Sequence, residues 1–325
     1  SDPDIVTKIS SGRAEEIRPC VGANLCIAQA TEGKPVRCFH NAETAREASW
    51  GPAEPAARPQ HVVVIGGGPA GMEAARVAAG RGHRVTLFEH QKELGGQLRM
   101  WARAPLTKEF AKTVTWLEDE LRRMQVRVRT GEAVRVEDIE TLDADAVILA
   151  TGSRPGPSPL IDGQIESEIC VMNTWSAIEK KSASAHIVLW DEGGGRGGLS
   201  AIDCLLDDNR ITVVTSQTAV GELINPNIRT PLYKRFMGGG AVMRPNETIT
   251  RLTGRSVITR NIYSEEESRI DDVDILVNWQ GNEVIDDLAD AIRACGLPLH
   301  VVGDATAPRQ VHIAIAEGAI AGRKV

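Results

Sequence analysis

Long apolar runs and an excess of positive charge are both missing from this chain of 325 residues. No segment approaches the roughly 20 consecutive apolar residues that cross a bilayer, and residues 1–20 are too polar for a signal peptide. Lysine and arginine number 37 against 44 aspartate and glutamate, which gives a net charge of −7. This balance argues against bulk affinity for nucleic acid or anionic membranes. We therefore expect a cytoplasmic protein that binds neither.

Cysteine is scarce as well, with six residues, three of them within the first 38. Six is too few for a disulfide scaffold in a chain of this length. No Cys-x-x-Cys pair occurs, which argues against a dithiol redox enzyme of the thioredoxin kind. Away from the N-terminal group, we expect Cys170, Cys204 and Cys295 to be small buried hydrophobic residues.

The composition is otherwise that of a globular protein, with 42% apolar and 25% charged residues. At about 150 residues per domain, the length predicts two domains. Residues 61–90 give a β-branched apolar run, a glycine turn, an alanine-rich helix and a second strand, and residues 186–216 repeat this order. Such β-α-β units imply parallel sheets. We predict an α/β fold with two Rossmann-like dinucleotide-binding domains and an approximate internal duplication.

Two further elements are expected between these units. Apolar residues at 110, 114, 117, 121 and 124 step by four and three, which places them on one face of a helix over residues 107–124. Residues 145–150 are apolar and predict another strand, which ends at a glycine.

The first glycine turn lies between a strand and a helix, the context that makes G-x-G-x-x-G informative, and it consists of Gly66, Gly67, Gly68, Pro69, Ala70 and Gly71. Gly66 permits a tight turn, Gly68 lets a pyrophosphate approach the backbone, and Gly71 lets helix and strand pack closely. The helix N-terminus would present free N–H groups and a partial positive charge to the phosphates. Glu89 ends the second strand, where a carboxylate can accept hydrogen bonds from an adenosine ribose.

Three features elsewhere in the chain favour FAD over NAD at this loop. A second close backbone approach follows the ribose acid at Gly95, Gly96 and Gln97. A later strand ends in Ala150, Thr151 and Gly152. Near the C-terminus, Gly303 and Asp304 form a strand-to-helix turn, where an aspartate could bind a ribityl hydroxyl or phosphate group. Each feature is weak alone, and together they are specific.

The motifs VVVIGGGPAGMEAA, LGGQ, ILATGSRP and VGDA together resemble flavoproteins of the glutathione-reductase-like fold. The N-terminal sequence SDPDIVTKISSGRAEEIRPCVGANLC is similar to the segment that joins an FMN-binding TIM barrel to such domains in the trimethylamine dehydrogenase and 2,4-dienoyl-CoA reductase family. CVGAN and CFHNAETARE look closest to its N-methylproline demethylase-like branch. The resemblance covers nearly the whole chain and implies the C-terminal portion of such an enzyme, without its barrel.

The resemblance also implies a cysteine motif that holds an iron–sulfur cluster in the family. The matching positions are Cys20, Ala23, Cys26 and Cys38, so one thiolate is missing. Clusters normally take four thiolates. Three could hold a three-iron cluster, or a four-iron cluster with a substitute ligand such as His40 or Asn24. A loop with free thiols is the other interpretation.

The second glycine turn again fits G-x-G-x-x-G, with Gly193, Gly195 and Gly198 in the three glycine positions. In the fold that the resemblance implies, this turn would serve NAD(P)H. The strand that follows ends in Ser216 and Gln217, with neither an acid for a ribose hydroxyl nor an arginine for a 2′-phosphate. A working nicotinamide site and a structural relic are both compatible with this sequence.

These observations give a domain plan: residues 1–48 as a cysteine-containing junction, 49–58 as a linker, 59–183 with 284–325 as an FAD- or ADP-binding domain, and 184–283 as an NAD(P)-binding-like domain. We expect the chain to relay electrons between FAD or NAD(P)H and an FMN-bearing TIM barrel, in the same longer chain or in a partner subunit. The barrel would carry out amine demethylation or enoate reduction. We further expect an oligomer and a possible electron-transfer protein as partner.

Two alternatives stay open at this stage. The chain could be a stand-alone NAD(P)H:acceptor flavin reductase, with residues 1–48 as a docking arm. It could also be a non-catalytic module that holds ADP for structure. No acid–base residue in the sequence is assigned a catalytic role, because the protein's contribution would be to bind, orient and tune cofactors.

Overall fold

The computed structural model describes residues 1–51, 53–158, 160 and 165–325. Residue 52, in the expected linker, and residues 159 and 161–164, in the expected 59–183 domain, lie outside the described residues. The chain divides into two compact units. Unit 1 comprises Ser1–Arg99, Glu109–Arg154 and Glu283–Val325, and unit 2 comprises Met100–Lys108 and Pro155–Asn282.

Unit 1 is built on a five-stranded parallel sheet, in the order β16-β4-β1-β2-β3. Its strands are β1 (His61–Ile65), β2 (Arg84–Glu89), β3 (Arg127–Thr130), β4 (Ala146–Leu149) and β16 (Leu299–Val301). The central strands β1 and β4 are apolar and almost wholly buried. Such apolar runs are typical of parallel strands that are covered on both faces.

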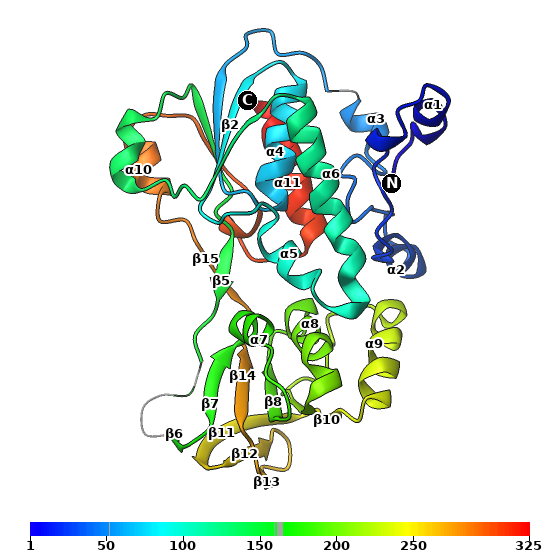
Figure 1. The fold of residues 1–325 in the computed structure, drawn as a ribbon, viewed down its shortest axis with the longest axis vertical. Helices are drawn as coiled ribbons and strands as arrows, with labels where there is room; N and C mark the ends of the chain where they lie inside the picture. Colours follow the sequence, from blue (N-terminus) through cyan, green and yellow to red (C-terminus); the bar gives the residue numbers. More distant parts are fainter. Residues whose placement is uncertain (52, 159, 161–164) are drawn as a thin grey trace. The chain divides into compact units, whose positions relative to one another are not determined.

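Two helices rich in small residues pack on this sheet, α4 (Pro69–Gly80) and α11 (Val311–Lys324). Figure 1 shows them side by side, and α4 also contacts α6. A Cβ at Gly318 of α11 would lie 2.1 Å from the carbonyl oxygen of Ala70, so only glycine allows this approach. The smaller elements of unit 1 are α5 (Gly96–Trp101), α10 (Ala289–Ala294) and the 3₁₀ turns η3 (Val136–Thr141) and η5 (Gly303–Ala305).

The helix expected over residues 107–124 forms in two parts. A 3₁₀ turn, η2 (Pro105–Phe110), precedes the α-helix α6 (Ala111–Arg123). The expected apolar face is buried at Phe110, Val114, Leu117 and Leu121. The 3.5-residue average spacing therefore predicted the buried face correctly, although the α-helix begins four residues later than expected.

The N-terminal segment contains the short helices α1 (Ile5–Ser10), η1 (Ala14–Glu16), α2 (Leu25–Thr31) and α3 (Glu47–Trp50), and residues 16, 18 and 40 contact α6. Trp116 of α6 is the anchor. Its indole N–H donates to the carbonyl of Glu16 at 3.1 Å, the guanidinium of Arg18 lies 4.3 Å from its ring centroid, and His40 meets it edge-on at 5.0 Å. This segment is therefore an integral part of unit 1.

Unit 2 contains a second five-stranded parallel sheet, in the order β10-β9-β8-β14-β7. Its strands are β7 (Cys170–Asn173), β8 (His186–Asp191), β9 (Arg210–Val214), β10 (Val242–Arg244) and β14 (Ile275–Trp279). Read from β7, this order matches that of unit 1 strand by strand, which is the expected internal duplication. The predicted α/β fold with two dinucleotide-binding-like domains is confirmed.

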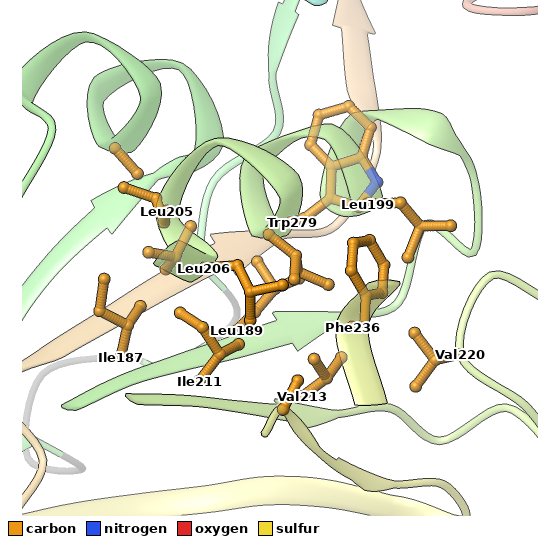
Figure 2. Close-up of a cluster of buried hydrophobic side chains, with 14 of the residues drawn as sticks. Ile187, Leu189, Leu199, Leu205, Leu206, Ile211, Val213, Val220, Phe236 and Trp279 are labelled. Atoms are coloured by element: carbon orange, nitrogen blue, oxygen red, sulfur yellow. The ribbon is translucent and has the colours of Figure 1, made fainter. Parts of the chain in front are cut away.

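The helices of unit 2 are α7 (Thr174–Lys180), α8 (Arg196–Leu205), η4 (Leu206–Asp208) and α9 (Pro226–Gly238). They cover the apolar face of the sheet that Figure 2 shows, where Leu199, Phe236 and Trp279 gather over Ile187 and Leu189. Unit 2 also contains a four-stranded sheet, and its strands are β6 (Ile165–Ser167), β11 (Glu247–Gly254), β12 (Ser256–Asn261) and β13 (Glu267–Ile270).

Strand β7 joins the sheet of unit 2 by pairing with β14, ahead of the expected boundary at residue 184. The chain passes between the units at β5 (Ser153–Pro155) and β15 (Asn282–Val284), which form a two-stranded sheet. Among the described residues, no helix is long and apolar enough to cross a membrane.

Candidate functional site

The first glycine turn connects β1 to α4, and two of its glycines are required by the protein itself. Gly66 has a φ of +111°, and a Cβ there would lie 2.2 Å from the carbonyl oxygen of Ala150. A Cβ at Gly71 would lie 1.9 Å from the carbonyl oxygen of Gly66. These contacts hold the turn tightly against the end of β4, in the roles that the sequence predicts for the first and third glycines.

Gly68 differs because nothing in the described protein requires a glycine there. Its backbone is extended (φ −73°, ψ 178°), and no atom lies within 4 Å of a Cβ built on it. The open space lies before the N-terminus of α4, where the first-turn N–H groups have no intrahelical partner. A Cβ at Gly96 would approach the Cα of Gly68 to 3.4 Å, so a second backbone segment borders the same place. The turn therefore has the form of an anion cradle.

Glu89 lies beside this cradle at the end of β2, and it is buried. Its Oε2 accepts the N–H of Gly67 at 2.7 Å, and its Oε1 accepts the N–H of Gln91 at 2.7 Å. The Nδ1 of His90 lies 2.8 Å from the same Oε1. The carboxylate is thus fixed against the middle glycine of the turn, at the position expected for the acid that binds a ribose.

Asp304 gathers residues from three distant parts of the chain. Its Oδ2 accepts the hydroxyl of Ser153 at 2.8 Å and the amide of Gln97 at 3.4 Å, and this amide also donates to the Ser153 hydroxyl at 2.8 Å. Its Oδ1 accepts the N–H of Arg309 at 3.1 Å. The motifs LGGQ, ATGS and VGDA therefore meet at one carboxylate.

The turn at Gly303 is held against the helices that form the cradle. Gly303 has a φ of +66°, and a Cβ there would lie 2.8 Å from that of Ala70. Its N–H donates to Oε2 of Glu317 at 2.9 Å, and Oε1 of Glu317 pairs with Arg309 at 2.6 Å. Nothing in the sequence marks Ser153 or Glu317 as part of a site, because their partners lie 151 and 14 positions away.

Thr151 and Gly152 hold the segment that returns from unit 2. The Thr151 hydroxyl donates to the carbonyl of Ile285, and the N–H of Ile285 donates to the carbonyl of Gly152 at 3.0 Å. The structure thus places all thirteen residues expected for the first nucleotide in unit 1: Gly66, Gly68, Pro69, Ala70, Gly71, Glu89, Gly96, Gln97, Ala150, Thr151, Gly152, Gly303 and Asp304.

The second glycine turn lies in unit 2, between β8 and α8, and contains the expected Gly193, Gly195 and Gly198. Its surroundings differ from those of the first. The N–H of Gly194 donates to Oδ1 of Asp191 at 3.0 Å, and a Cβ at Gly193 would lie 2.2 Å from the indole nitrogen of Trp279. Burial raises the pKa of Asp191 to about 7.

The three N-terminal cysteines are not gathered with other donors into a metal-binding group within the described residues. Cys20 and Cys26 are exposed, and Cys38 is half-buried. Ala23, at the missing ligand position, is 7% exposed. The described residues contain no group of three or more His, Cys, Asp or Glu side chains that could hold a metal ion. With three thiolates at these positions, this set of donors does not fit the four-thiolate cluster.

The other cysteines correct an expectation of burial. Cys170 and Cys295 are exposed, and Cys204 is half-buried. Cys170 begins β7, an edge strand of its sheet, and Cys295 caps the C-terminus of α10. Edge strands and helix ends lie at the surface, which outweighs the general tendency of a free thiol to be buried.

Comparison with known proteins places the chain in a family. A family model described as pyridine nucleotide-disulphide oxidoreductase matches residues 28–138 and 60–318. The chain is 31% identical to an N,N-dimethylglycine/sarcosine dehydrogenase of Chromohalobacter salexigens, over 97% of this chain and 51% of that protein. It is also 31% identical to an NADH oxidase of Thermoanaerobacter brockii, over 98% of this chain and 49% of that protein.

A solved structure gives the same picture of the fold. The histamine dehydrogenase from Rhizobium sp. 4-9 matches with a TM-score of 0.91 at 23% identity, over 100% of this chain and 53% of that one. The chain thus spans about half the length of these relatives. It belongs to the pyridine nucleotide-disulphide oxidoreductase family. The expected kinship with the FAD-binding part of trimethylamine dehydrogenase-like enzymes is confirmed.

The residues of unit 1 fit FAD. The open cradle at Gly68 and the N-terminus of α4 suit a pyrophosphate, and the Glu89 carboxylate suits an adenosine ribose. The hydrogen-bonded group of Gln97, Ser153 and Asp304 adds polar side chains beyond what the ADP half alone would need.

Proposed function

We propose that the chain relays electrons between FAD in unit 1 and an FMN-bearing TIM barrel, carried by the same longer chain or by a partner subunit. Bound FAD supplies the hydride and one-electron chemistry. The barrel carries the substrate, an N-methylated amine, and takes two electrons from its N-methyl group; water then releases the demethylated amine and formaldehyde. The observation that carries this proposal is the meeting of four sequence motifs around one open glycine turn in unit 1.

The chain's own residues bind and orient the cofactor. The first-turn N–H groups of α4 hold the pyrophosphate, and Gly68 leaves the space that it occupies. Glu89 accepts the ribose hydroxyls while it keeps the turn closed through the N–H of Gly67. Asp304, fixed by Ser153 and Gln97, accepts hydroxyls of the ribityl chain.

A partner is part of the proposal because the chain spans about half of its relatives and contains no assigned substrate site. The N,N-dimethylglycine/sarcosine dehydrogenase is 31% identical, and its name describes oxidation of N-methyl amino acids. This supports an N-methylated amine as the substrate of the assembled enzyme. An electron-transfer protein is the proposed acceptor, and the assembly is proposed to be oligomeric and cytoplasmic.

The test uses the chain assembled with its barrel and loaded with FMN and FAD. Dimethylglycine, sarcosine and N-methylproline are mixed with it anaerobically, and the reduction of an external dye is followed. In wild type, the substrate drives reduction of the dye. The variant Gly68→Ala places a methyl group in the open cradle without touching protein, so it loses FAD and passes no electrons to the dye.

Two results would contradict the proposal. One is full dye reduction by a Gly68→Ala enzyme that has lost its FAD, because electrons would then bypass unit 1. The other is ADP, with no flavin, in the purified wild-type chain. That outcome would make unit 1 a structural nucleotide module.

A further inference from the structure

We infer that the second glycine turn does not bind NAD(P)H and that it serves unit 2 as a structural turn. The chain then exchanges electrons through the nucleotide of unit 1 alone. This inference deepens the proposed function and rests on it. Gly195 of the second turn is extended (φ −109°, ψ −167°), as Gly68 is in the first turn, and the nearest atom to a Cβ built on Gly195 is 3.7 Å away. What surrounds the turn excludes the cofactor.

Two carboxylates stand directly before the glycines of the second turn. Asp191 ends β8 with no exposed surface, and its Oδ2 has no partner among the described residues. Glu192 follows at once. A pyrophosphate seated on this turn would bring its negative charges close to both groups. Charge repulsion in such a poorly hydrated place is far stronger than in water.

The side chain of Glu192 is also held in place around the turn. It accepts the indole N–H of Trp190 at 2.7 Å and the backbone N–H of Ser216 at 3.3 Å, and the Ser216 hydroxyl bonds to its other oxygen. These bonds keep a carboxylate between the turn and the end of β9. The strand pairing matches Trp190 with Ile65 of unit 1, so Asp191 and Glu192 stand where unit 1 has Gly66 and Gly67.

The ribose-binding acid is missing at the matching position of unit 2. Gln217 lies against the middle glycine as Glu89 does in unit 1: its Oε1 would be 2.3 Å from a Cβ at Gly194, and Oε2 of Glu89 would be 3.0 Å from one at Gly67. The amide carries no charge and is turned inward, donating to the carbonyl of Glu192 at 2.9 Å. The ribose diol would lack its usual carboxylate partner.

The adjacent strand, β10, offers no unpaired cation that could bind the 2′-phosphate of NADPH. Arg244 ends β10, and its backbone carbonyl accepts the N–H of Thr215. Its guanidinium pairs with Glu247 at 2.9 Å. A 2′-phosphate there would have to displace this ion pair, so we expect NADPH to bind no more tightly than NADH.

Trp279 fills the end of the sheet where a dinucleotide would pass. Its indole lies along the turn, so close that a Cβ at Gly193 or Gly197 would come within 2.2 and 2.3 Å of its ring atoms. The ring is 7% exposed and belongs to the apolar cluster with Leu199 (Figure 2). The ends of β8 and β14 meet here, at the switch point where open parallel sheets bind ligands. The residue of unit 1 that corresponds to Trp279 is Ala150.

Equilibrium dialysis of the FAD-loaded chain against NADH and NADPH tests the inference. We expect no saturable binding of either dinucleotide up to about 1 mM, the upper end of ordinary substrate affinities. The double variant Asp191→Asn with Glu192→Gln removes both carboxyl groups and keeps a hydrogen-bond acceptor at each position. A gain of NADH binding by this variant, at least about tenfold over wild type, would support the electrostatic exclusion.

Saturable binding of NADH or NADPH to wild type, lost in Gly195→Val with the FAD content unchanged, would overturn the inference. Rapid bleaching of the flavin by NADH without a partner would overturn it as well. The FAD content, read from visible absorption, is measured in every sample. A failure of the FAD proposal would therefore appear as colourless protein and could not be mistaken for a result on the second turn.

Discussion

Glu89 and Gln217 lie at matching places beside the middle glycines of the two turns, and only Glu89 carries a charge. In unit 1 the acid from β2 accepts the N–H of the middle glycine. In unit 2 the acid comes from β8 itself, because Asp191 accepts the N–H of Gly194. Both turns satisfy the same backbone donor, but only the first has its carboxylate on the ribose side.

Replacing Glu89 should therefore weaken FAD binding. Glu89→Ala leaves the N–H groups of Gly67 and Gln91 without their charged acceptor, which costs roughly 1–3 kcal/mol. We expect the Kd for FAD to rise by about tenfold or more, measured by quenching of flavin fluorescence. Glu93→Ala is the matched control, because Glu93 is exposed and only loosely paired with Arg99 at 3.9 Å. Equal affinities for the two variants would contradict the role given to Glu89.

Asp191 should make unit 2 sensitive to pH. Burial raises its pKa from 3.8 to about 7, and Glu192 acts in the same direction. The folded state therefore holds this proton more tightly than the unfolded state. The stability from protonated Asp191 is fully present below about pH 4 and is lost as the pH rises to about 7.

Asp191→Asn removes this titration and keeps an acceptor for the N–H of Gly194. Between about pH 5 and about pH 8, wild type should lose more stability than the variant by roughly 2–3 kcal/mol, because about two pH units of the shift lie in this interval. Urea denaturation at several pH values measures this difference. Parallel stability profiles for the two proteins would show that Asp191 does not titrate as described.

At the scale of elements, the contact between α4 and α11 sets the shape of the nucleotide site. A Cβ at Gly318 would lie 2.1 Å from the carbonyl oxygen of Ala70, and one at Gly322 would lie 2.7 Å from that of Ala74. Ala70 is in the first turn of α4, whose N–H groups form the cradle. A small displacement of α11 is therefore transmitted directly to the turn that is proposed to bind the pyrophosphate.

Gly318→Ala should destabilise unit 1 by about 1–3 kcal/mol, the usual cost of overpacking, and should weaken FAD binding at the same time. Gly80→Ala is the control within α4. Its new methyl group would meet only Met124, at 3.8 Å, and alanine favours a helix by up to about 1 kcal/mol over glycine. Thermal unfolding and FAD titration of both variants distinguish them. Similar behaviour of the two would contradict the packing argument.

Much of the fold and of the first site could be predicted because short patterns encode them. The β-branched run before Gly66, the turn and the alanine-rich helix are contiguous, so one continuous segment of the sequence contains the whole pattern. Strand β7 could not be assigned to unit 2 in this way, because its partner β14 lies about a hundred positions away. The contact of Ser153 with Asp304 and that of Trp279 with the second turn could not be predicted either, because each joins residues that are far apart in the sequence.

At the scale of the molecule, the N-terminal segment is held to unit 1 by a buried cluster of charged and aromatic side chains. Glu73 of α4 accepts two bonds from Arg76 at 2.8 Å, and the Arg76 guanidinium lies 5.7 Å from the centroid of the Trp116 ring. Arg18 and His40 of the segment contact the same indole. Burial and the adjacent Arg18 lower the pKa of His40 to about 3, so it contributes no charge at neutral pH.

Trp116→Ala should release this segment from the rest of unit 1. Truncation of a buried tryptophan typically costs about 3–5 kcal/mol, and here the lost contacts are mainly those to residues 16, 18 and 40. Limited proteolysis should then cut within residues 1–48 much faster than in wild type. Trp116→Phe keeps a smaller aromatic ring for Arg18 and His40 and loses the N–H bond to Glu16, so its cleavage should stay much slower than that of Trp116→Ala. Equal protection of the segment in Trp116→Ala would contradict the anchoring role.

The central claim is that unit 1 holds FAD at the first glycine turn, and the most direct measurement is the identity, amount and affinity of the nucleotide on the purified chain. We predict one FAD per wild-type chain. Gly68→Ala, whose methyl group meets no protein atom, should bind FAD at least about tenfold more weakly with an unchanged Tm of the FAD-free protein. A wild-type chain without flavin, or a Gly68→Ala variant that binds FAD as tightly as wild type, would contradict the account.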